Sequence, residues 1–128
     1  MKFSTRAEYG LKAMVNLALD FPKVKSVKEI AHKENISQKY LERLIGELRR
    51  KKLVKSHKGR NGGYTLSSNP KKIKVGKIIE ILEGPLLPLK CQREECVGKH
   101  CLSKKVWMVL WKQIKRTLYN IKLDDLVK

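Results

Sequence analysis

The sequence predicts a mainly α-helical protein that carries one small β-hairpin and a long helix near its C-terminal end. Three observations support this prediction. Apolar residues recur at helical spacing in four segments before residue 84. Two short β-prone runs, at 53–54 and 64–66, flank a glycine-containing turn. A further amphipathic helical pattern extends from residue 102 to about residue 120.

The first half of the chain predicts three helices, each preceded by a hydroxyl side chain that can accept a hydrogen bond from the first helical turn. They are expected over residues 5–20, 26–34 and 37–51, with the caps Ser4 or Thr5, Ser26 and Ser37. The break at 35–37 leaves only a tight turn between the second and the third helix. Two helices joined in this way are typical of a helix-turn-helix motif.

A β-hairpin is expected directly after the third helix. The Asn61-Gly62-Gly63 run can supply the positive φ angles that a tight hairpin needs. Seven Lys and Arg residues and no acidic residue lie between Arg49 and Arg60, so the end of the third helix and the hairpin are expected to form one basic ridge. A merely solvated face would be expected to include carboxylates as well. The sequence therefore predicts a winged helix-turn-helix whose wing follows a phosphate backbone.

The rest of the chain predicts a fourth helix over 75–83, a loop, and the long helix. Residues 84–101, which we call the cysteine segment, include prolines and glycines and are not expected to form a regular element. The long helix carries a wide apolar stripe, and its own domain can cover only part of it, so we expect a dimer interface there. The predicted organisation is a winged helix-turn-helix domain at 1–83, the cysteine segment at 84–101, and a dimerisation helix with a C-terminal tail at 102–128.

The charge of the chain indicates its class of partner. The 128 residues carry a formal net charge of +18, far more than solubility needs, which favours a polyanion such as double-stranded DNA over the alternative, an anionic membrane surface. No segment is apolar and long enough for a signal peptide or a membrane span, so we expect a cytoplasmic protein that does not enter membranes. An enzyme is not expected, because no catalytic partner is evident for the three histidines, His32, His57 and His100.

The predicted DNA contacts form two groups. The start of the third helix, which in this motif reaches base edges in the major groove, contributes Ser37, Gln38, Lys39, Tyr40, Glu42 and Arg43. The ridge and the wing contribute Arg49, Arg50, Lys55, Lys58, Arg60, Asn61 and Gly62. Gln38 suits adenine and Arg43 suits guanine. Arg60 suits the narrow minor groove.

The chain contains three cysteines, Cys91, Cys96 and Cys101, and His100 precedes the last of them. In a reducing cytoplasm, clustered cysteines indicate metal ligands or redox-active thiols rather than a structural disulfide. Three interpretations remain open. The cysteines can hold an iron-sulfur cluster with a fourth ligand that is not a thiol, they can hold a structural zinc ion together with His100, or two of them can act as a thiol switch.

Four stretches, taken in order, resemble a known family. They are ISQKYLERLIGELRRKKLV, KGRNGGYTL, VGKIIEILEG and the three-cysteine segment. On these stretches the chain resembles the Rrf2 family of winged-helix transcriptional regulators, and within it the branch that binds iron-sulfur clusters. The resemblance implies a homodimer on a palindromic DNA operator and a [2Fe-2S] or [4Fe-4S] cluster held by Cys91, Cys96 and Cys101. It also implies a regulator, such as a repressor, that senses redox state, nitric oxide or iron-sulfur supply.

Without a cluster, the alternative function is a winged-helix repressor whose signal is a structural zinc, a thiol switch or a protein partner.

The identity of the fourth ligand bears on whether a cluster is bound. Cluster-binding relatives have a histidine three residues after the last cysteine, and this chain has Lys104 there. The carboxylates and histidines available instead are Glu8, His32, Glu94, Glu95 and His100.

The resemblance favours Glu8 contributed by the partner subunit, because a first-helix carboxylate plays this part in some relatives, and it leaves His100 as the alternative. The residues themselves also allow another use for Glu8. It can complete a capping box with Thr5 and bond only to the backbone of its own helix.

Overall fold

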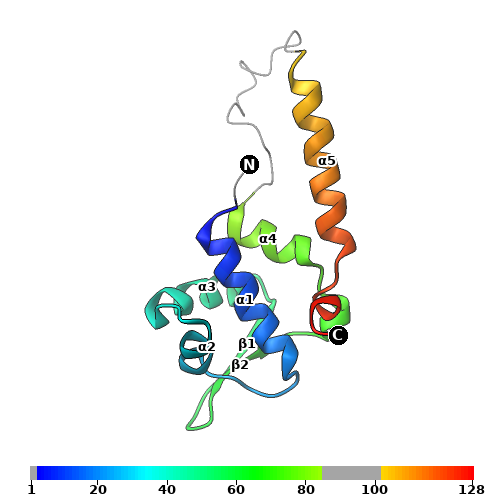
Figure 1. The fold of residues 1–128 in the computed structure, drawn as a ribbon. Coiled ribbons are helices and arrows are strands. Elements are labelled where there is room, and N and C mark those ends of the chain that lie inside the picture. The colour runs from blue at the N-terminus through cyan, green and yellow to red at the C-terminus, as the bar shows by residue number, and fades with distance from the viewer. Residues whose placement is uncertain (1–2, 85–101) are drawn as a thin grey trace.

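The computed structural model describes residues 3–84 and 102–128. In chain order its elements are α1 (Thr5–Leu19), α2 (Val27–Glu34), α3 (Gln38–Arg50), β1 (Val54–His57), β2 (Gly63–Leu66), the short 3-10 helix η1 (Pro70–Lys72), α4 (Val75–Glu83), α5 (Lys104–Asn120) and the 3-10 helix η2 (Leu123–Leu126). Figure 1 shows α1 to α4 and the sheet gathered in one unit, with α5 extending away from it. The predicted mainly α-helical fold with a small β-wing is confirmed.

The core of this unit lies where α1, α3 and α4 face one another. The largest side chains there have at most 2% of their surface exposed, and they come from apolar positions at helical spacing: Met14, Leu17, Leu41, Leu44, Ile45, Leu48, Ile78 and Leu82. Full burial of one Leu or Ile side chain contributes about 1.5–3 kcal/mol. These apolar faces therefore hold the three helices together and determine where α3 lies.

Serine caps begin the first three helices. The Oγ atoms of Ser4, Ser26 and Ser37 each accept a hydrogen bond from the backbone N–H three residues later, at 3.1 to 3.3 Å. Such a cap contributes about 1 kcal/mol, because the N–H groups of the first turn have no partner within the helix. Since Ser4 is the cap, Thr5 is already helical, and the predicted capping box between Thr5 and Glu8 is wrong.

Left-handed residues end α2 and α3. Asn35 follows α2 with a φ of 55°, and Lys52 follows the cap of α3 with a φ of 65°. In each case the N–H of the next residue bonds to the carbonyl five positions earlier at 2.9 Å, which satisfies one of the last carbonyls of the helix. The tight ending at Asn35 allows Ser37 to begin α3 two residues later, as a helix-turn-helix motif requires.

The wing is the antiparallel hairpin of β1 and β2. Its tip is closed by a hydrogen bond from the Gly62 N–H to the Gly59 carbonyl at 3.0 Å, which makes Arg60 and Asn61 the two central residues of the turn. The positive φ angles fall at Gly59, 108°, and Gly63, 157°. Of the predicted run Asn61-Gly62-Gly63, Gly63 is confirmed, whereas Asn61 and Gly62 do not have positive φ angles and Gly59 supplies the other one. Gly62 is needed for a different reason, because a Cβ there would overlap the backbone of β1.

The C-terminal residues return to the winged-helix unit. Leu123 is fully buried in the core, and its N–H donates to the Ile73 carbonyl at 2.8 Å. The N–H of Val75 donates to the Ile121 carbonyl at 2.9 Å. Residues 121–127 thus pack on the unit formed by the first part of the chain, although the sequence-based division grouped them with the long helix.

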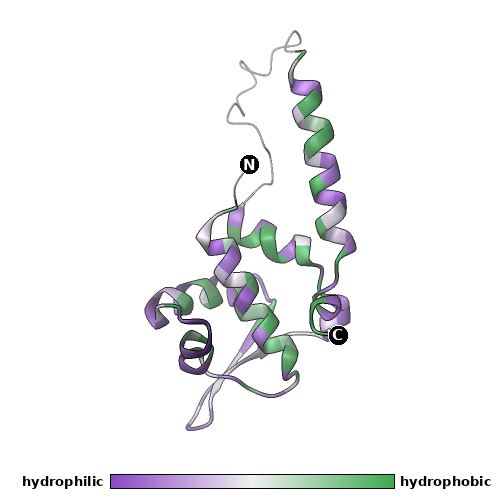
Figure 2. Cartoon of the chain, in the orientation of Figure 1, coloured by the Kyte–Doolittle hydropathy of each residue, from purple (hydrophilic) through white to green (hydrophobic). Residues whose placement is uncertain are grey.

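The helix α5 differs from the other long helices because none of its residues is buried. The exposed fractions of Val106, Trp107 and Leu110 are 62%, 42% and 38%. Figure 2 shows hydrophobic residues along the length of this helix, where it extends away from the rest of the described chain. Contacts with its own unit, chiefly with α4, come from its C-terminal end.

Candidate nucleic-acid interface

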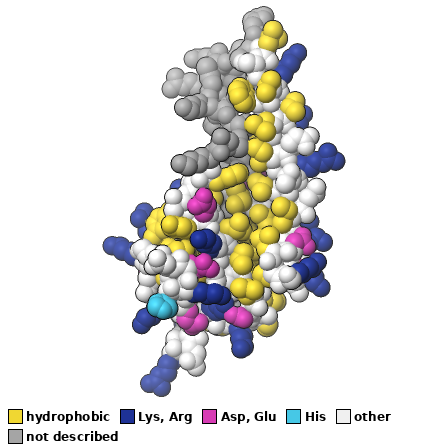
Figure 3. All heavy atoms as spheres, viewed as in Figure 1, with side chains coloured by type: hydrophobic (Ala, Val, Ile, Leu, Met, Phe, Trp, Pro, Cys, Tyr) yellow, Lys and Arg dark blue, Asp and Glu magenta, His cyan; other side chains and the backbone are white. Residues whose placement is uncertain are grey.

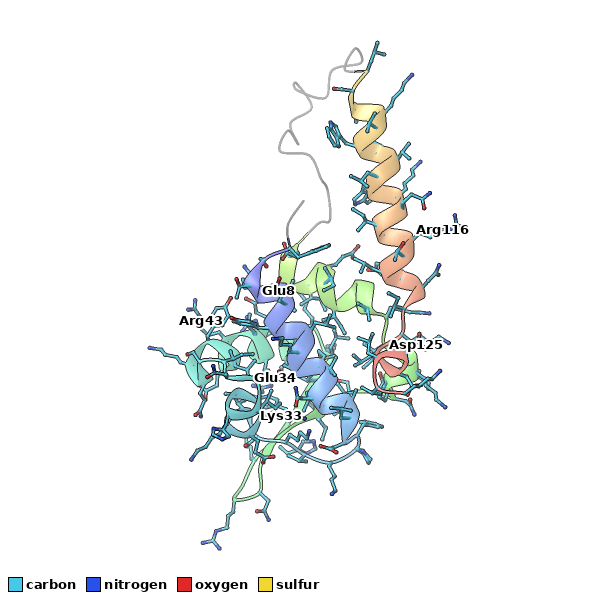
Figure 4. The ribbon with its side chains drawn as sticks, viewed as in Figure 1. Glu8, Lys33, Glu34, Arg43, Arg116 and Asp125 are labelled. Carbon is cyan, nitrogen blue, oxygen red and sulfur yellow. The ribbon has the colours of Figure 1, made fainter. Side chains whose placement is uncertain are left out.

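The start of α3 presents the polar side chains that the sequence suggested for reading bases. Gln38, Lys39, Glu42 and Arg43 are exposed, and Figure 4 shows Arg43 at the surface of the unit. The Nε2 atom of Gln38 donates to Oε1 of Glu42 at 3.5 Å, a long and therefore weak hydrogen bond. Both groups can exchange this contact for hydrogen bonds to base edges.

Tyr40 lies on the same turn but faces another way. Its half-buried ring meets the ring of Tyr9 edge-on, with centroids 6.1 Å apart and an interplanar angle of 84°. An edge-to-face pair of this kind contributes about 0.5–1.5 kcal/mol beyond its buried area. Tyr40 therefore holds the start of α3 against α1.

The basic ridge consists of exposed cations without partners. Every Lys and Arg side chain of the ridge is exposed, and none of them forms an ion pair with another described residue: Arg49, Arg50, Lys51, Lys52, Lys55, Lys58 and Arg60. Figure 3 shows Lys and Arg side chains projecting around the end of the molecule that carries the wing. Unpaired surface cations of one sign favour binding to a polyanion.

The wing is held firmly although its tip is exposed. Tyr64 of β2 exchanges two backbone hydrogen bonds with Lys25, at 2.8 and 3.0 Å, so the linker before α2 pairs with the outer side of the hairpin. Across the hairpin, Nε2 of His57 and Oγ1 of Thr65 form a hydrogen bond of 2.9 Å. Arg60 and Asn61 therefore lie at the end of a rigid support.

Two contacts that the sequence did not reveal join α1 to the other helices. Nη2 of Arg6 lies 3.3 Å from Oε2 of Glu47, which links α1 to α3. The backbone N–H of Ser4 donates to Oε1 of Glu83 at 2.6 Å, which links the start of α1 to the end of α4. The paired residues are 41 and 79 positions apart in the chain, so no local pattern could have indicated them.

Glu8 lies on the first turns of α1 (Figure 4), where its backbone N–H donates to the carbonyl of Ser4 at 3.2 Å, and Ser4 is the residue that bonds to Glu83. Its carboxylate is exposed and makes no hydrogen bond or ion pair with the residues at 3–84 and 102–128. The chain enters the cysteine segment at Gly84, directly after Glu83. Glu8 is thus an available carboxylate on the helix that is bonded to the residue preceding that segment.

The predicted metal ligands of the cysteine segment, Cys91, Cys96, Cys101 and the alternative His100, lie outside the described residues. Within the part of the chain that the structure describes, no group of three or more His, Cys, Asp or Glu residues is placed to hold a metal ion. His32 is exposed on α2.

Among the helices of residues 3–84 and 102–128, none is both long and apolar enough to cross a membrane.

A helical unit with a basic two-stranded wing, and with a helix-turn-helix whose second helix begins with exposed polar residues, defines a winged-helix DNA-binding protein. The comparisons with known proteins agree. Residues 3–128 match the Rrf2 family, whose description is iron-dependent transcriptional regulator. The chain belongs to the Rrf2 family of transcriptional regulators.

Similar proteins include two kinds of named regulator. The sequence is 39% identical over 127 residues to the HTH-type transcriptional regulator CymR of Bacillus subtilis, covering 98% of this chain and 89% of that protein. The solved structure of the same protein, titled the global cysteine regulator of B. subtilis, aligns with a TM-score of 0.84 at 37% identity, over 99% of this chain and 96% of that chain.

The solved structure of T. potens IscR aligns with a TM-score of 0.81 at 41% identity, over 99% of this chain and 86% of that chain. The oxidised form of Staphylococcus aureus CymR aligns with a TM-score of 0.82 at 34% identity, over 100% of this chain and 97% of that chain. These relatives are transcriptional regulators, which confirms a regulatory rather than an enzymatic function.

Proposed function

We propose that two copies of this chain bind a palindromic DNA operator as a homodimer, with the start of α3 in the major groove and the tip of the wing in the minor groove. The observation that carries this proposal is the set of exposed cations between Arg49 and Arg60, which form no ion pair with another described residue and lie next to the exposed polar start of α3. Cations without carboxylate partners neutralise phosphates, and polar side chains at the start of the helix distinguish bases. The exposed apolar residues of α5 supply the dimer interface.

The test separates base reading from phosphate binding. We expect Gln38→Ala to weaken binding to the operator by about 1–3 kcal/mol, as loss of a bidentate base contact does, and to leave binding to scrambled DNA unchanged. Lys55→Ala should weaken binding to both duplexes and reduce the salt dependence. Lys112→Ala, an exposed lysine on α5, is the matched control. Equal losses on the two duplexes for Gln38→Ala would remove this residue from base reading.

For the signal, we propose that Cys91, Cys96 and Cys101 hold an iron-sulfur cluster, with the partner subunit's Glu8 as the fourth ligand. Three thiolates and one oxygen ligand form a workable donor set for iron. The iron-dependent description of the family supports a cluster. The carboxylate of Glu8 is exposed and forms no ion pair with another described residue, and it lies on the helix whose cap, Ser4, bonds to Glu83 at the end of α4. These features support its choice as the fourth ligand. When bound, such a cluster supplies sensitivity to oxidation and to nitric oxide.

A carboxylate ligand on α1 would couple the cysteine segment to DNA binding. The start of α1 is bonded to Glu83 on one side and, through Arg6, to Glu47 of α3 on the other. A change in the position of α1 would therefore act on α3 through a direct contact. For this coupling to change the DNA affinity, the position of α1 must differ between the protein with the cluster and the protein without it.

The test of the cluster is a visible absorption spectrum of protein purified without oxygen. Broad bands that bleach on oxidation support the cluster, and a colourless protein that holds zinc rejects it. Glu8→Ala and His100→Ala are then compared for absorbance per subunit and for operator affinity with and without the cluster. The neighbouring Thr5→Ala is the control. A Glu8→Ala protein that keeps a full, oxidation-resistant cluster and the same affinity difference would exclude Glu8 as the ligand.

A second candidate signal is a thiol switch without a cluster. It is supported by the likeness to the cysteine regulator of B. subtilis and to the S. aureus relative solved in an oxidised form. In this case a colourless protein should change its operator affinity on mild oxidation, and replacing either of the two cysteines that pair by serine should abolish the change. The DNA-binding proposal does not depend on which signal is read.

A further inference from the structure

Within residues 3–84 and 102–128, the apolar packing of α5 on its own unit comes from its last turns. Leu118 and Ile121 pack against a small apolar cluster of Ala7, Val75 and Ile79. Two backbone hydrogen bonds just beyond the helix, described above, hold the chain where it leaves α5. We call this attachment, from Leu118 to Leu123, the root of α5. None of the α5 residues at 104–117 is buried as a whole, so the root is the part of the helix that packs into the apolar clusters of its own unit.

Tyr119 is held at both ends of its side chain against one face of α4. Its ring lies on Gly76, where a Cβ would overlap the ring atoms Cδ2 and Cε2. Its hydroxyl donates a hydrogen bond of 2.7 Å to Oε2 of Glu80, one helical turn further along α4. Gly76 is not needed for a positive φ, so its value at this position is the space that it leaves for the ring.

The hydrogen bond is partly buried, and its electrostatic surroundings agree with the geometry. Burial, and next the hydrogen bond from the hydroxyl to the Glu80 carboxylate, raise the pKa of Tyr119 to about 12. The phenol therefore stays protonated and bonded to Glu80 at any physiological pH. The contact is a fixed feature of the root.

We propose that Gly76, Glu80 and Tyr119 form a joint that fixes the direction of α5 relative to α3, and that this joint sets the half-site spacing that the dimer accepts on DNA. The inference rests on the proposed function, because it requires that α5 form the dimer interface. In such a dimer, each α3 is connected to the partner through α4, the joint and α5.

Simple geometry shows that a small change at the joint matters. A helix of this length is a lever of roughly 25 Å, because each residue adds about 1.5 Å. A tilt of roughly eight degrees at one end moves the other end by about 3.4 Å, which is the rise of one base pair of B-DNA. A methyl group inserted beneath the Tyr119 ring forces a displacement at the root itself.

The experiment uses the full chain and DNA that the wild-type protein selects from a random duplex pool. From the selected operator, a series of duplexes is made with the two half-sites moved closer or further apart by one and two base pairs, together with a single half-site duplex. Gly76→Ala displaces the ring, and Tyr119→Phe keeps the ring but removes its hydrogen bond. Thr117→Ala, at an exposed position of the same turn, is the control.

We expect Gly76→Ala to lose about tenfold or more in affinity for the selected spacing, because the two half-sites can no longer be engaged together, with less than about twofold loss on the single half-site. Its preferred spacing should shift. Tyr119→Phe should accept a wider range of spacings than the wild type, and Thr117→Ala should behave as the wild type. Small-angle X-ray scattering of the DNA-free dimers should show a changed envelope for Gly76→Ala. The envelope of Tyr119→Phe either changes as well or stays as in the wild type.

Other outcomes overturn the proposal. An equal loss for Gly76→Ala on every spacing and on the half-site would mean that the joint is only structural. If circular dichroism shows that Gly76→Ala does not fold, an unchanged spacing profile of Tyr119→Phe overturns the joint. If the wild type selects no sequence, the proposed function fails instead. Scattering then tests the joint separately, and identical envelopes for wild type and variants would reject it.

Discussion

The helices α3 and α5 carry similar apolar stripes, yet their surroundings differ completely. Leu41, Leu44 and Leu48 of α3 are at most 2% exposed, whereas Val106 and Leu110 of α5 are 62% and 38% exposed. The helical periodicity is equally clear in both. Periodicity therefore indicates that a helix face is to be covered, and it does not indicate whether the cover comes from the same chain or from another molecule.

The largest expected effect is in the core. Leu44→Ala should lower the free energy of unfolding by about 2–5 kcal/mol, because a cavity is left among packed neighbours. Urea unfolding followed by circular dichroism measures this change. A loss below about 1 kcal/mol would mean that Leu44 does not lie in a closed core.

A smaller effect on folding, but a large one on assembly, is expected on α5. Leu110→Glu should split the dimer, because an unpaired charge buried in an interface costs about 3–5 kcal/mol. The melting temperature of the resulting monomer should change little, since Leu110 is 38% exposed and belongs to neither apolar cluster of the described residues. Sedimentation with circular dichroism tests both statements, with Lys112→Glu on the polar face of α5 as the control. A Leu110→Glu chain that unfolds would show that its own chain covers this face.

The junction between the two regions should respond to alkaline pH. The pKa of Tyr119 is raised to about 12 in the folded state, from an ordinary value of 10. The unfolded chain therefore loses this proton first, and the stabilisation from the neutral phenol, full below pH 10, is lost as the pH rises toward 12. Tyr119→Phe should remove this part of the pH dependence, measured by urea unfolding between pH 9 and pH 12. The same alkaline loss in both proteins would contradict the assignment.

The smallest effect is expected in the backbone of the winged-helix unit. Lys52 has a φ of 65°, a conformation that costs a side chain other than Gly or Asn about 1 kcal/mol. Lys52→Gly should therefore raise the free energy of unfolding by about 0.5 kcal/mol, after the greater entropy of glycine in the unfolded chain is subtracted. Asn35→Gly, at the matching position after α2, should gain less. A loss of stability for Lys52→Gly would mean that its side chain has a packing role.

Most of the fold could be predicted because its signals are local. The serine caps lie within three residues of the groups they bond, and the Gly-containing turn lies between its own strands. The errors were local as well. Ser4, not Thr5, caps α1, which excludes the capping box of Thr5 with Glu8. In the hairpin, a positive φ angle falls at Gly59 rather than at Asn61 or Gly62. In both places, more than one neighbouring residue can adopt the required conformation.

The surroundings of the candidate sites were less predictable. Exposed cations on the ridge follow from the absence of acidic residues nearby, a pattern visible in the sequence. The bonds of Ser4 with Glu83 and of Arg6 with Glu47 join residues that are distant in the chain, as does the bond of Tyr119 with Glu80. No spacing rule reveals such pairs, because they depend on how α1, α3, α4 and α5 pack against one another.

By itself, the sequence determined the elements, the winged helix-turn-helix and the basic character of its binding face. These properties depend on side-chain periodicity, caps and charge, which act over a few residues. Only the tertiary structure decided that Leu123 returns to the core and that Tyr119 lies on Gly76. It also decided that no residue of α5 is buried by the rest of the described chain. The reason is that these three features depend on the distances between helices and strands. Packing of the side chains determines those distances, and the local preferences of the residues do not.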